Sequence, residues 1–175
     1  MALTDTQKQT QSLFNGFNRI YAVPDGTSVP DLRMKLYQMR PEYACLYRGE
    51  LTPDMAEVAP YLVRMVVVTD FCDWVLTEGW GSHWGIFAQS RYSLAEVRKH
   101  LRSFLTVHDE TGTPMLFRFY DPRVLRKFLV SCNNEELKKF FGIILNFALE
   151  DENPEILLNY YLPDGELKIN CSEIA

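Results

Sequence analysis

Hydrophobic and polar positions change period repeatedly along the chain, and the changes predict helices and strands in alternation up to about residue 130. Short apolar and aromatic runs are typical of strands, and they occur at residues 19–23, 43–47, 61–68 and 84–88. Between these runs, apolar residues recur at helical spacing in segments that cover residues 4–18 and 69–78 and that follow Pro30, Pro53 and Ser93.

Several helix ends are marked by local signals. Ser93 followed by Glu96 is a capping box, and Asn133 followed by Glu136 has the same spacing. At residues 121–122 an aspartate stands where an N-cap belongs and a proline occupies the first helical position, where its missing N–H costs nothing. Gly79 and Gly142 are placed to end the helices before them.

The last third of the chain is predicted to be richer in strands. Residues 107 and 115–120 flank a turn and indicate a hairpin, whose second strand leads directly into the helix at residues 121–129. Late strands are predicted at residues 143–149, 156–162 and 166–169, although the first of these could equally be helical.

This order predicts an α/β fold, with a mixed sheet and alternating helices. Alternation favours parallel pairing in the body, whereas the hairpin and the late strands favour antiparallel additions. No clear linker divides the chain, but the change in pattern suggests a main lobe at residues 1–130 and a smaller C-terminal lobe at residues 131–175.

Composition and charge exclude some classes of protein. Hydrophobic residues make up 47% of the chain, enough for a packed core, so disorder is not expected. The net charge of −5 argues against a nucleic-acid-binding protein. Residues 131–175 hold 3 Lys and Arg against 9 Asp and Glu, an imbalance that favours solubility or a basic partner.

The sequence also bears on compartment and metal chemistry. The four cysteines are scattered and form no Cys-x-x-Cys pair, so neither a zinc site nor a redox motif is expected. The first residues lack the apolar core of a signal peptide, and no apolar run is long enough to span a membrane. We therefore expect a cytoplasmic protein with no membrane partner.

The glycine-rich segment Gly-Trp-Gly-Ser-His-Trp-Gly at residues 79–85 is one candidate for chemistry. It lacks the spacing of a phosphate-binding loop and leads into a strand rather than a helix, so we expect its glycines to allow tight turns and close approach around Trp80 and Trp84. His83 lies between the two tryptophans. A structural, hydrogen-bonded imidazole is favoured over a catalytic or metal-binding one, because no second ligand stands at a suitable spacing.

A second candidate is the junction between the predicted strand and helix around residue 121. Arg118, Asp121 and Arg123 cluster there without a nucleophile or base, and such clusters are more often structural ion-pair networks than binding sites. Glu150 and Glu152 are predicted to lie in a solvated turn, so they do not suggest a general acid–base pair.

Six segments together resemble the family of type VI secretion effector chaperones, also called adaptors, which was first catalogued as a bacterial domain of unknown function. The resemblance spans about residues 19–145 and rests most on Gly-Trp-Gly-Ser-His-Trp-Gly at residues 79–85 and Phe-Arg-Phe-Tyr-Asp-Pro-Arg at residues 117–123. The other segments are residues 21–26, 43–51, 57–62 and 97–105.

The resemblance implies a binding protein rather than an enzyme, with no cofactor and no metal. Such chaperones bind a toxic effector, usually through its N-terminal part, and help to load it onto the valine-glycine-repeat spike protein. The resemblance also implies a mixed α/β structure with two lobes that form a cradle.

Tryptophan and arginine are frequent at the energetic centres of interfaces. The candidate partner-binding residues are therefore Trp80, His83, Trp84, Arg118, Asp121 and Arg123. Two alternatives stay open: an immunity protein that neutralises a toxin, and a small hydrolase that uses His83 with Asp121 or with a partner not identified from the sequence.

Overall fold

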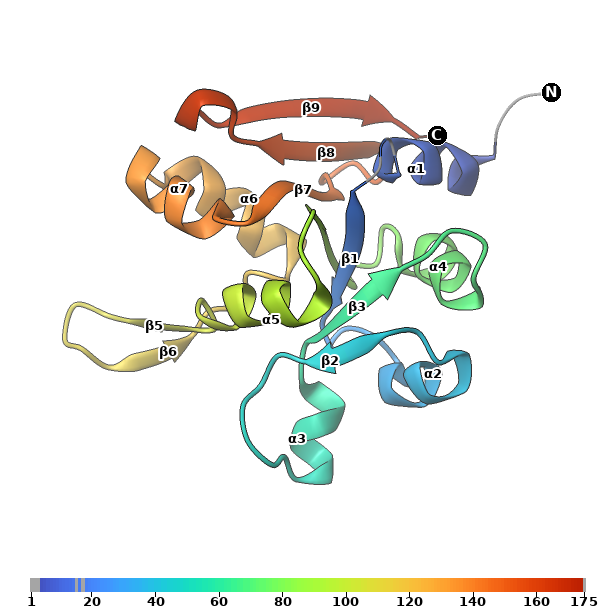
Figure 1. The fold of residues 1–175 in the computed structure, drawn as a ribbon, viewed down its shortest axis with the longest axis horizontal. Coiled ribbons are helices and arrows are strands. Elements are labelled where there is room, and N and C mark those ends of the chain that lie inside the picture. Colours follow the sequence, from blue (N-terminus) through green and yellow to red (C-terminus); the bar gives the residue numbers. More distant parts are fainter. Residues whose placement is uncertain (1–3, 15, 17, 175) are drawn as a thin grey trace.

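The computed structural model describes residues 4–14, 16 and 18–174, and its centre is a seven-stranded sheet with helices on both faces (Figure 1). In spatial order the strands are β2 (Tyr43–Cys45), β3 (Tyr61–Met65), β1 (Arg19–Pro24), β4 (Gly85–Ser90), β7 (Ile144–Glu150), β8 (Ile156–Tyr161) and β9 (Lys168–Glu173). A separate two-stranded hairpin, β5 (Thr106–His108) and β6 (Pro114–Leu116), projects from this body.

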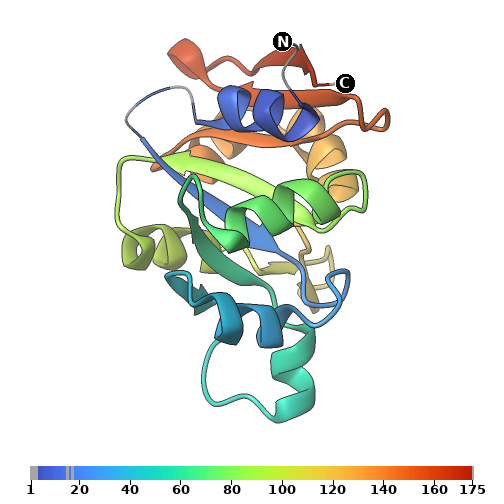
Figure 2. The same ribbon diagram turned by 90° about the vertical axis from the view of Figure 1, so that its right-hand side faces the viewer.

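The helices divide between the two faces of the sheet. One hydrophobic cluster joins the sheet to α5 (Leu94–Arg102), α6 (Pro122–Ser131) and α7 (Asn134–Phe141). The other joins it to α1 (Asp5–Leu13), α2 (Leu32–Met39), α4 (Asp70–Trp74) and the π-helical turn η1 (Val75–Gly79). Figure 2 shows α4 and α2 in front of the strands, while α3 (Pro53–Val58) stands at one end and the 3₁₀ turn η2 (Pro163–Gly165) precedes β9.

The α/β class is confirmed, but the parallel pairing predicted for the body is wrong. Every strand pair in the sheet is antiparallel. Helices cover both faces, so β1 is buried from Ile20 to its end, with Tyr21 and Val23 in one cluster and Ile20 and Ala22 in the other. A strand buried on both faces reads as a continuous apolar run, the pattern typical of parallel sheets.

The strands after residue 130 extend the same sheet. β7 pairs with β4, and β8 and β9 follow in order, so the ambiguous segment at residues 143–149 is a strand. The lobe boundary at residue 130 stays a prediction. The predicted first helix ends at Leu13, and the rest of its predicted range includes residues 15 and 17, which lie outside the described residues.

Most of the predicted helix-end signals are confirmed. Ser93 and Asn133 both form capping boxes, with Glu96 and Glu136 respectively, and Gly142 follows the last residue of α7. Gly79 differs from expectation, because it is the last residue of η1 and does not take the left-handed conformation of a C′ glycine. No helix in the described part of the chain is long and apolar enough to cross a membrane.

An aromatic cluster on the α5–α7 side fixes the helices to the sheet. The ring of Phe140 lies 5.1 Å from that of Phe104, 5.1 Å from that of Phe128 and 5.0 Å from that of Phe147, measured between ring centroids. Phe140 is 1% exposed, so each of these contacts excludes water.

We expect Phe140→Ala to lower the free energy of unfolding by about 3–5 kcal/mol, because it leaves a cavity among rings from α6, β7 and the turn after α5. Val130→Ala on α6, where the native side chain is 64% exposed, is the matched control and should change it by less than about 0.5 kcal/mol. Chemical denaturation followed by circular dichroism measures both values. Equal effects of the two substitutions would contradict the central place of Phe140.

Candidate functional site

The glycine-rich segment connects η1 to β4 and packs its two tryptophans differently. Trp84 lies against Trp74, with 4.7 Å between ring centroids, and its ring also covers Gly79. A Cβ atom at Gly79 would stand 2.6 Å from Trp84 Cε3, so only glycine fits there. The close approach expected around the tryptophans is therefore confirmed.

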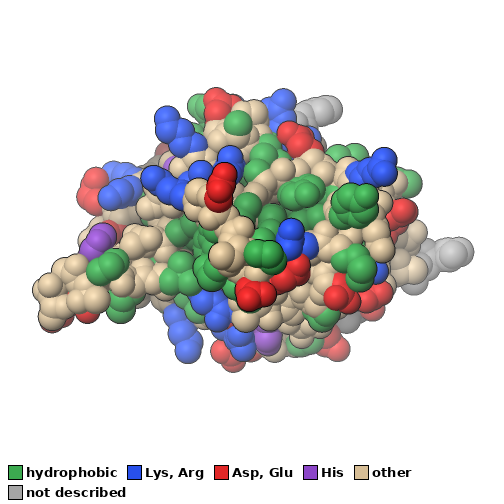
Figure 3. Space-filling view, turned by 90° about the horizontal axis from the view of Figure 1, so that it is seen from below, with side chains coloured by type: hydrophobic (Ala, Val, Ile, Leu, Met, Phe, Trp, Pro, Cys, Tyr) green, Lys and Arg blue, Asp and Glu red, His purple; other side chains and the backbone are tan. Residues whose placement is uncertain are grey.

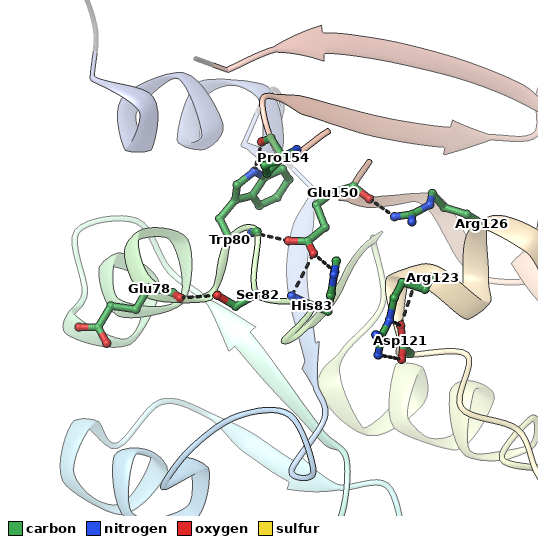
Figure 4. A network of polar contacts seen from close by, with 10 residues as sticks. Glu78, Trp80, Ser82, His83, Asp121, Arg123, Arg126, Glu150 and Pro154 are labelled. Carbon is green, nitrogen blue, oxygen red and sulfur yellow. Dashed lines mark hydrogen bonds and ion pairs between the residues drawn. The ribbon is translucent and has the colours of Figure 1, made fainter. Parts of the chain in front are cut away.

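The loop formed by residues 80–84 folds around the carboxylate of Glu150, at the end of β7 (Figure 4). The Gly81 N–H donates to Oε2 at 2.5 Å, and the His83 N–H donates to Oε1 at 3.0 Å. His83 Nδ1 contacts the same oxygen as the His83 N–H. Gly81 and His83 have φ values of +78° and +57°, which point their N–H groups inward, and a left-handed histidine is itself unfavourable by about 1 kcal/mol.

Further contacts join the loop to the connection between β7 and β8, and α6 to the end of β7. The indole N–H of Trp80 donates to the carbonyl oxygen of Pro154 at 2.6 Å, and its ring stacks on Phe87. Arg126 of α6 donates to the carbonyl oxygen of Glu150 at 2.7 Å. The expectation that Glu150 lies in a solvated turn is wrong, because the residue is 3% exposed.

Asp121 begins α6 as predicted. Its Oδ1 atom accepts from the Arg123 N–H at 2.9 Å, and its two carboxylate oxygens accept from Arg123 Nε at 3.0 Å and Nη2 at 2.7 Å. The carboxylate is therefore both an N-cap and one half of a bidentate ion pair. Burial alone would raise the pKa of Asp121, but the hydrogen bonds from Arg123 outweigh it and hold the pKa below its usual range.

The predicted strand before Asp121 is only partly present. β6 ends at Leu116, and Phe117–Tyr120 form an irregular turn, with Phe119 and Tyr120 fully buried in the core. Their aromatic side chains indicate burial rather than a pleated conformation, and strand propensity largely measures such packing.

Arg118 contacts a carboxylate that is not among the residues predicted from the sequence. Its Nη2 atom pairs with Asp25, which follows β1 and is 1% exposed. Asp25 also accepts from the Thr27 N–H at 3.0 Å, and its own N–H donates to the Trp84 carbonyl oxygen at 2.8 Å. The only signal was Pro24-Asp25-Gly26, which indicates a turn but not a partner 93 residues away.

Together these groups form what we term the carboxylate junction, in which three buried carboxylates each face a partly exposed side chain. The exposed fractions of the side chains of His83, Arg118 and Arg123 are 36%, 38% and 54%. Arg123 has a raised pKa, first because of its hydrogen bond to Asp121 and also because of the charges of Glu150 and Asp25. The carboxylates are Asp25, Asp121 and Glu150.

The acidic side chains of the junction are each paired with a basic side chain. His83 is paired with Glu150, and Asp121 with Arg123, so the structure does not join His83 and Asp121 as a dyad. The neighbouring Ser82 hydroxyl donates to the Glu78 carbonyl oxygen at 3.3 Å. The cavity beside Trp80 and Trp84 measures about 20 Å³, room for about one water molecule. No group of three or more potential metal ligands occurs among the described residues.

Comparison with known proteins gives one match. The family model described as a domain of unknown function, DUF4123, matches residues 20–139, which run from β1 into α7. Five of the six members of the junction lie within the match, and Glu150 lies beyond it. No curated protein and no solved structure matches the chain.

We expect Glu150→Gln to lower the free energy of unfolding by about 1–3 kcal/mol, because the amide offers one acceptor where the carboxylate offers two, and its NH₂ group would face N–H donors. Glu152→Gln removes the same charge from an exposed position in the connection that follows β7 and should have almost no effect. Urea denaturation of the two variants measures the difference. Equal values would show that the Glu150 contacts do not hold the loop.

The lowered pKa of Asp121 predicts a pH dependence with a defined sign. Stability from such a carboxylate is present above its unfolded-state pKa, about 3.9, and is lost as the pH falls through the lower folded-state value. We expect Asp121→Asn, which keeps an N-cap acceptor, to lose less unfolding free energy than the wild type between about pH 5 and pH 3. Denaturation across that range tests this, and identical pH profiles would refute it.

Proposed function

Since the chain belongs to the DUF4123 family, we propose that it is a chaperone, or adaptor, for a secreted effector of a type VI secretion system. In this role it binds a toxic effector in the cytoplasm, through the effector's N-terminal segment. It then helps to load the effector onto the valine-glycine-repeat spike protein. It acts by binding and not by catalysis.

The observation that carries the proposal is the set of segments that resemble such chaperones. Three of them are distant in sequence, at residues 21–26, 78–87 and 116–125, and they meet at Asp25, whose carboxylate pairs with Arg118 and whose N–H donates to the Trp84 carbonyl oxygen. Because they build one structural unit, their joint occurrence is harder to attribute to chance than three separate short motifs.

A surface suited to binding supports the same proposal. Large apolar side chains are exposed around α2, β2 and α3, among them Tyr37 at 75%, Met34 at 48% and Tyr43 at 44%. They border an open hollow of about 370 Å³ with Arg33 and Glu57 at its edge. Figure 3 views this end of the molecule, where hydrophobic side chains gather over the middle of the face. Such patches commonly mark protein-binding surfaces.

The six candidate partner-binding residues differ in how far their side chains are exposed. Arg123 is half exposed beside a shallow hollow along α6, which Lys127 and Phe128 also line. Trp80 and Trp84 are partly buried and pack against the core. Of the six candidates, Arg123 is therefore the one best placed to reach a partner.

The test is co-purification with the effector encoded by a neighbouring gene, with and without that effector's N-terminal segment. We expect a stoichiometric complex with the intact effector and none with the shortened one, because the proposed cargo is the N-terminal segment. Size-exclusion chromatography with mass determination measures both.

The other outcomes separate the alternatives. A complex that survives the deletion would place the contact on the toxic domain and favour an immunity protein. Turnover of the bound protein, or absence of any complex, would argue against the chaperone and for an enzyme. In an enzyme, the His83–Glu150 pair would be the first group to examine.

A further inference from the structure

A group of arginines lies around α5, which Figure 1 shows on the other side of α3 from α2 and its apolar hollow. Arg98 and Arg102, one turn apart on α5, donate to the backbone at the end of β2 and just after it. Arg98 Nε donates to the Cys45 carbonyl oxygen at 2.9 Å, and Arg102 Nε to the Leu46 carbonyl oxygen at 2.8 Å. Arg102 Nη2 also donates to the carbonyl oxygens of Cys45 and Tyr47, at 3.0 and 2.9 Å. Arg48 belongs to the segment that they hold.

These positive charges lack a negative partner within the described part of the chain. None of its ion pairs includes Arg48, Arg98 or Arg102, although Glu50 and Asp54 follow Arg48 closely in sequence. The pKa of Arg102 is lowered, first by burial and then by the charges of Arg98 and Arg48. Arg98 and Arg102 are thus held by neutral carbonyl groups, with the like charge of Arg48 nearby, in a chain whose net charge is −5.

Beside the arginines lies an open groove of about 400 Å³, which we term the arginine groove; its lining includes Tyr47, Arg48, Leu51, Met55, Arg102 and Leu116. Met55 is 46% exposed and Leu116 is 52% exposed. One wall is the hairpin β5–β6, all of whose strand residues are exposed. A hairpin without further strands is only marginally stable by itself, so an exposed apolar hairpin next to a groove is suited to packing against a partner.

We propose that the arginine groove binds an amphipathic protein segment that carries acidic side chains beside its apolar ones, and that this segment belongs to the cargo effector. The second part of this inference rests on the proposed function. The apolar side chains pack on Met55, Leu51 and Leu116, and the carboxylates supply the counter-charge that the arginines lack. A helix laid in the groove presents both kinds of side chain at spacings of three and four residues.

The first experiment measures the affinity of the full chain for the co-purified effector. We expect Arg48→Glu and Met55→Glu each to raise the dissociation constant by about tenfold or more, because each places a carboxylate where the acidic segment docks. Arg48 makes none of the side-chain hydrogen bonds that hold Arg98 and Arg102, so the fold should tolerate its change. Lys139→Glu, an equal charge change on exposed α7, is the control and should leave the affinity unchanged.

A second experiment tests the groove without an effector. The full chain is titrated with two matched amphipathic peptides that share one apolar face and carry Glu or Lys on the other, with fluorescence anisotropy as the readout. We expect preference for the Glu peptide, and loss of that preference in Arg48→Glu.

The two experiments distinguish the possible failures. Effector binding that resists both groove substitutions overturns the placement of the cargo in the groove and leaves the proposed function standing. Preference for the Glu peptide without effector binding supports the acidic-segment chemistry and overturns the proposed function. Equal binding of the two peptides, or absence of binding to either, overturns the inference about the groove itself.

Discussion

Asp25, Asp121 and Glu150 carry carboxylates that have almost no contact with water, and a buried charge is tolerated only where hydrogen bonds and a counter-charge replace its hydration. The chain order alone could not bring three such groups to one place. The antiparallel sheet does so for two of them: β1 and β7 both run opposite to β4, so both end where β4 begins. Asp25 and Glu150 therefore flank the loop that enters β4, and α6 begins beside them.

Much of the local structure follows from this requirement. The loop before β4 turns two N–H groups toward Glu150 and takes left-handed conformations at Gly81 and His83 to do so. Arg118 is drawn out of the predicted strand toward Asp25, and Arg123 closes on Asp121. Removing one member of such a pair is strongly unfavourable even where the intact pair adds little net stability, so the network fixes the geometry of the loops more than it strengthens the fold.

Features that depend on residues close in sequence, such as helix caps, could be predicted, whereas contacts between residues far apart in sequence could not. The capping boxes at Ser93 and Asn133 and the N-cap at Asp121 were found because donor and acceptor lie within three residues. The direction of strand pairing was missed because helices on both faces make antiparallel strands apolar throughout. Asp25 and Glu150 were missed because their partners lie 93 and 67 residues away, a separation at which a turn signal contains no information.

The arginines discussed above are of two kinds: those that already pair with a carboxylate, and those with no acidic partner among the described residues. Arg118 and Arg123 already face carboxylates, so a partner's acidic group would compete with an existing bond and could gain only part of the Coulomb attraction. Arg98 and Arg102 donate to carbonyl oxygens, and the charges of Arg98 and Arg48 oppose that of Arg102. An approaching carboxylate would therefore relieve repulsion as well as add attraction. Although Arg118 and Arg123 lie in one of the two segments on which the family resemblance most rests, physical chemistry therefore favours Arg48, Arg98 and Arg102 as the stronger attraction for an acidic partner.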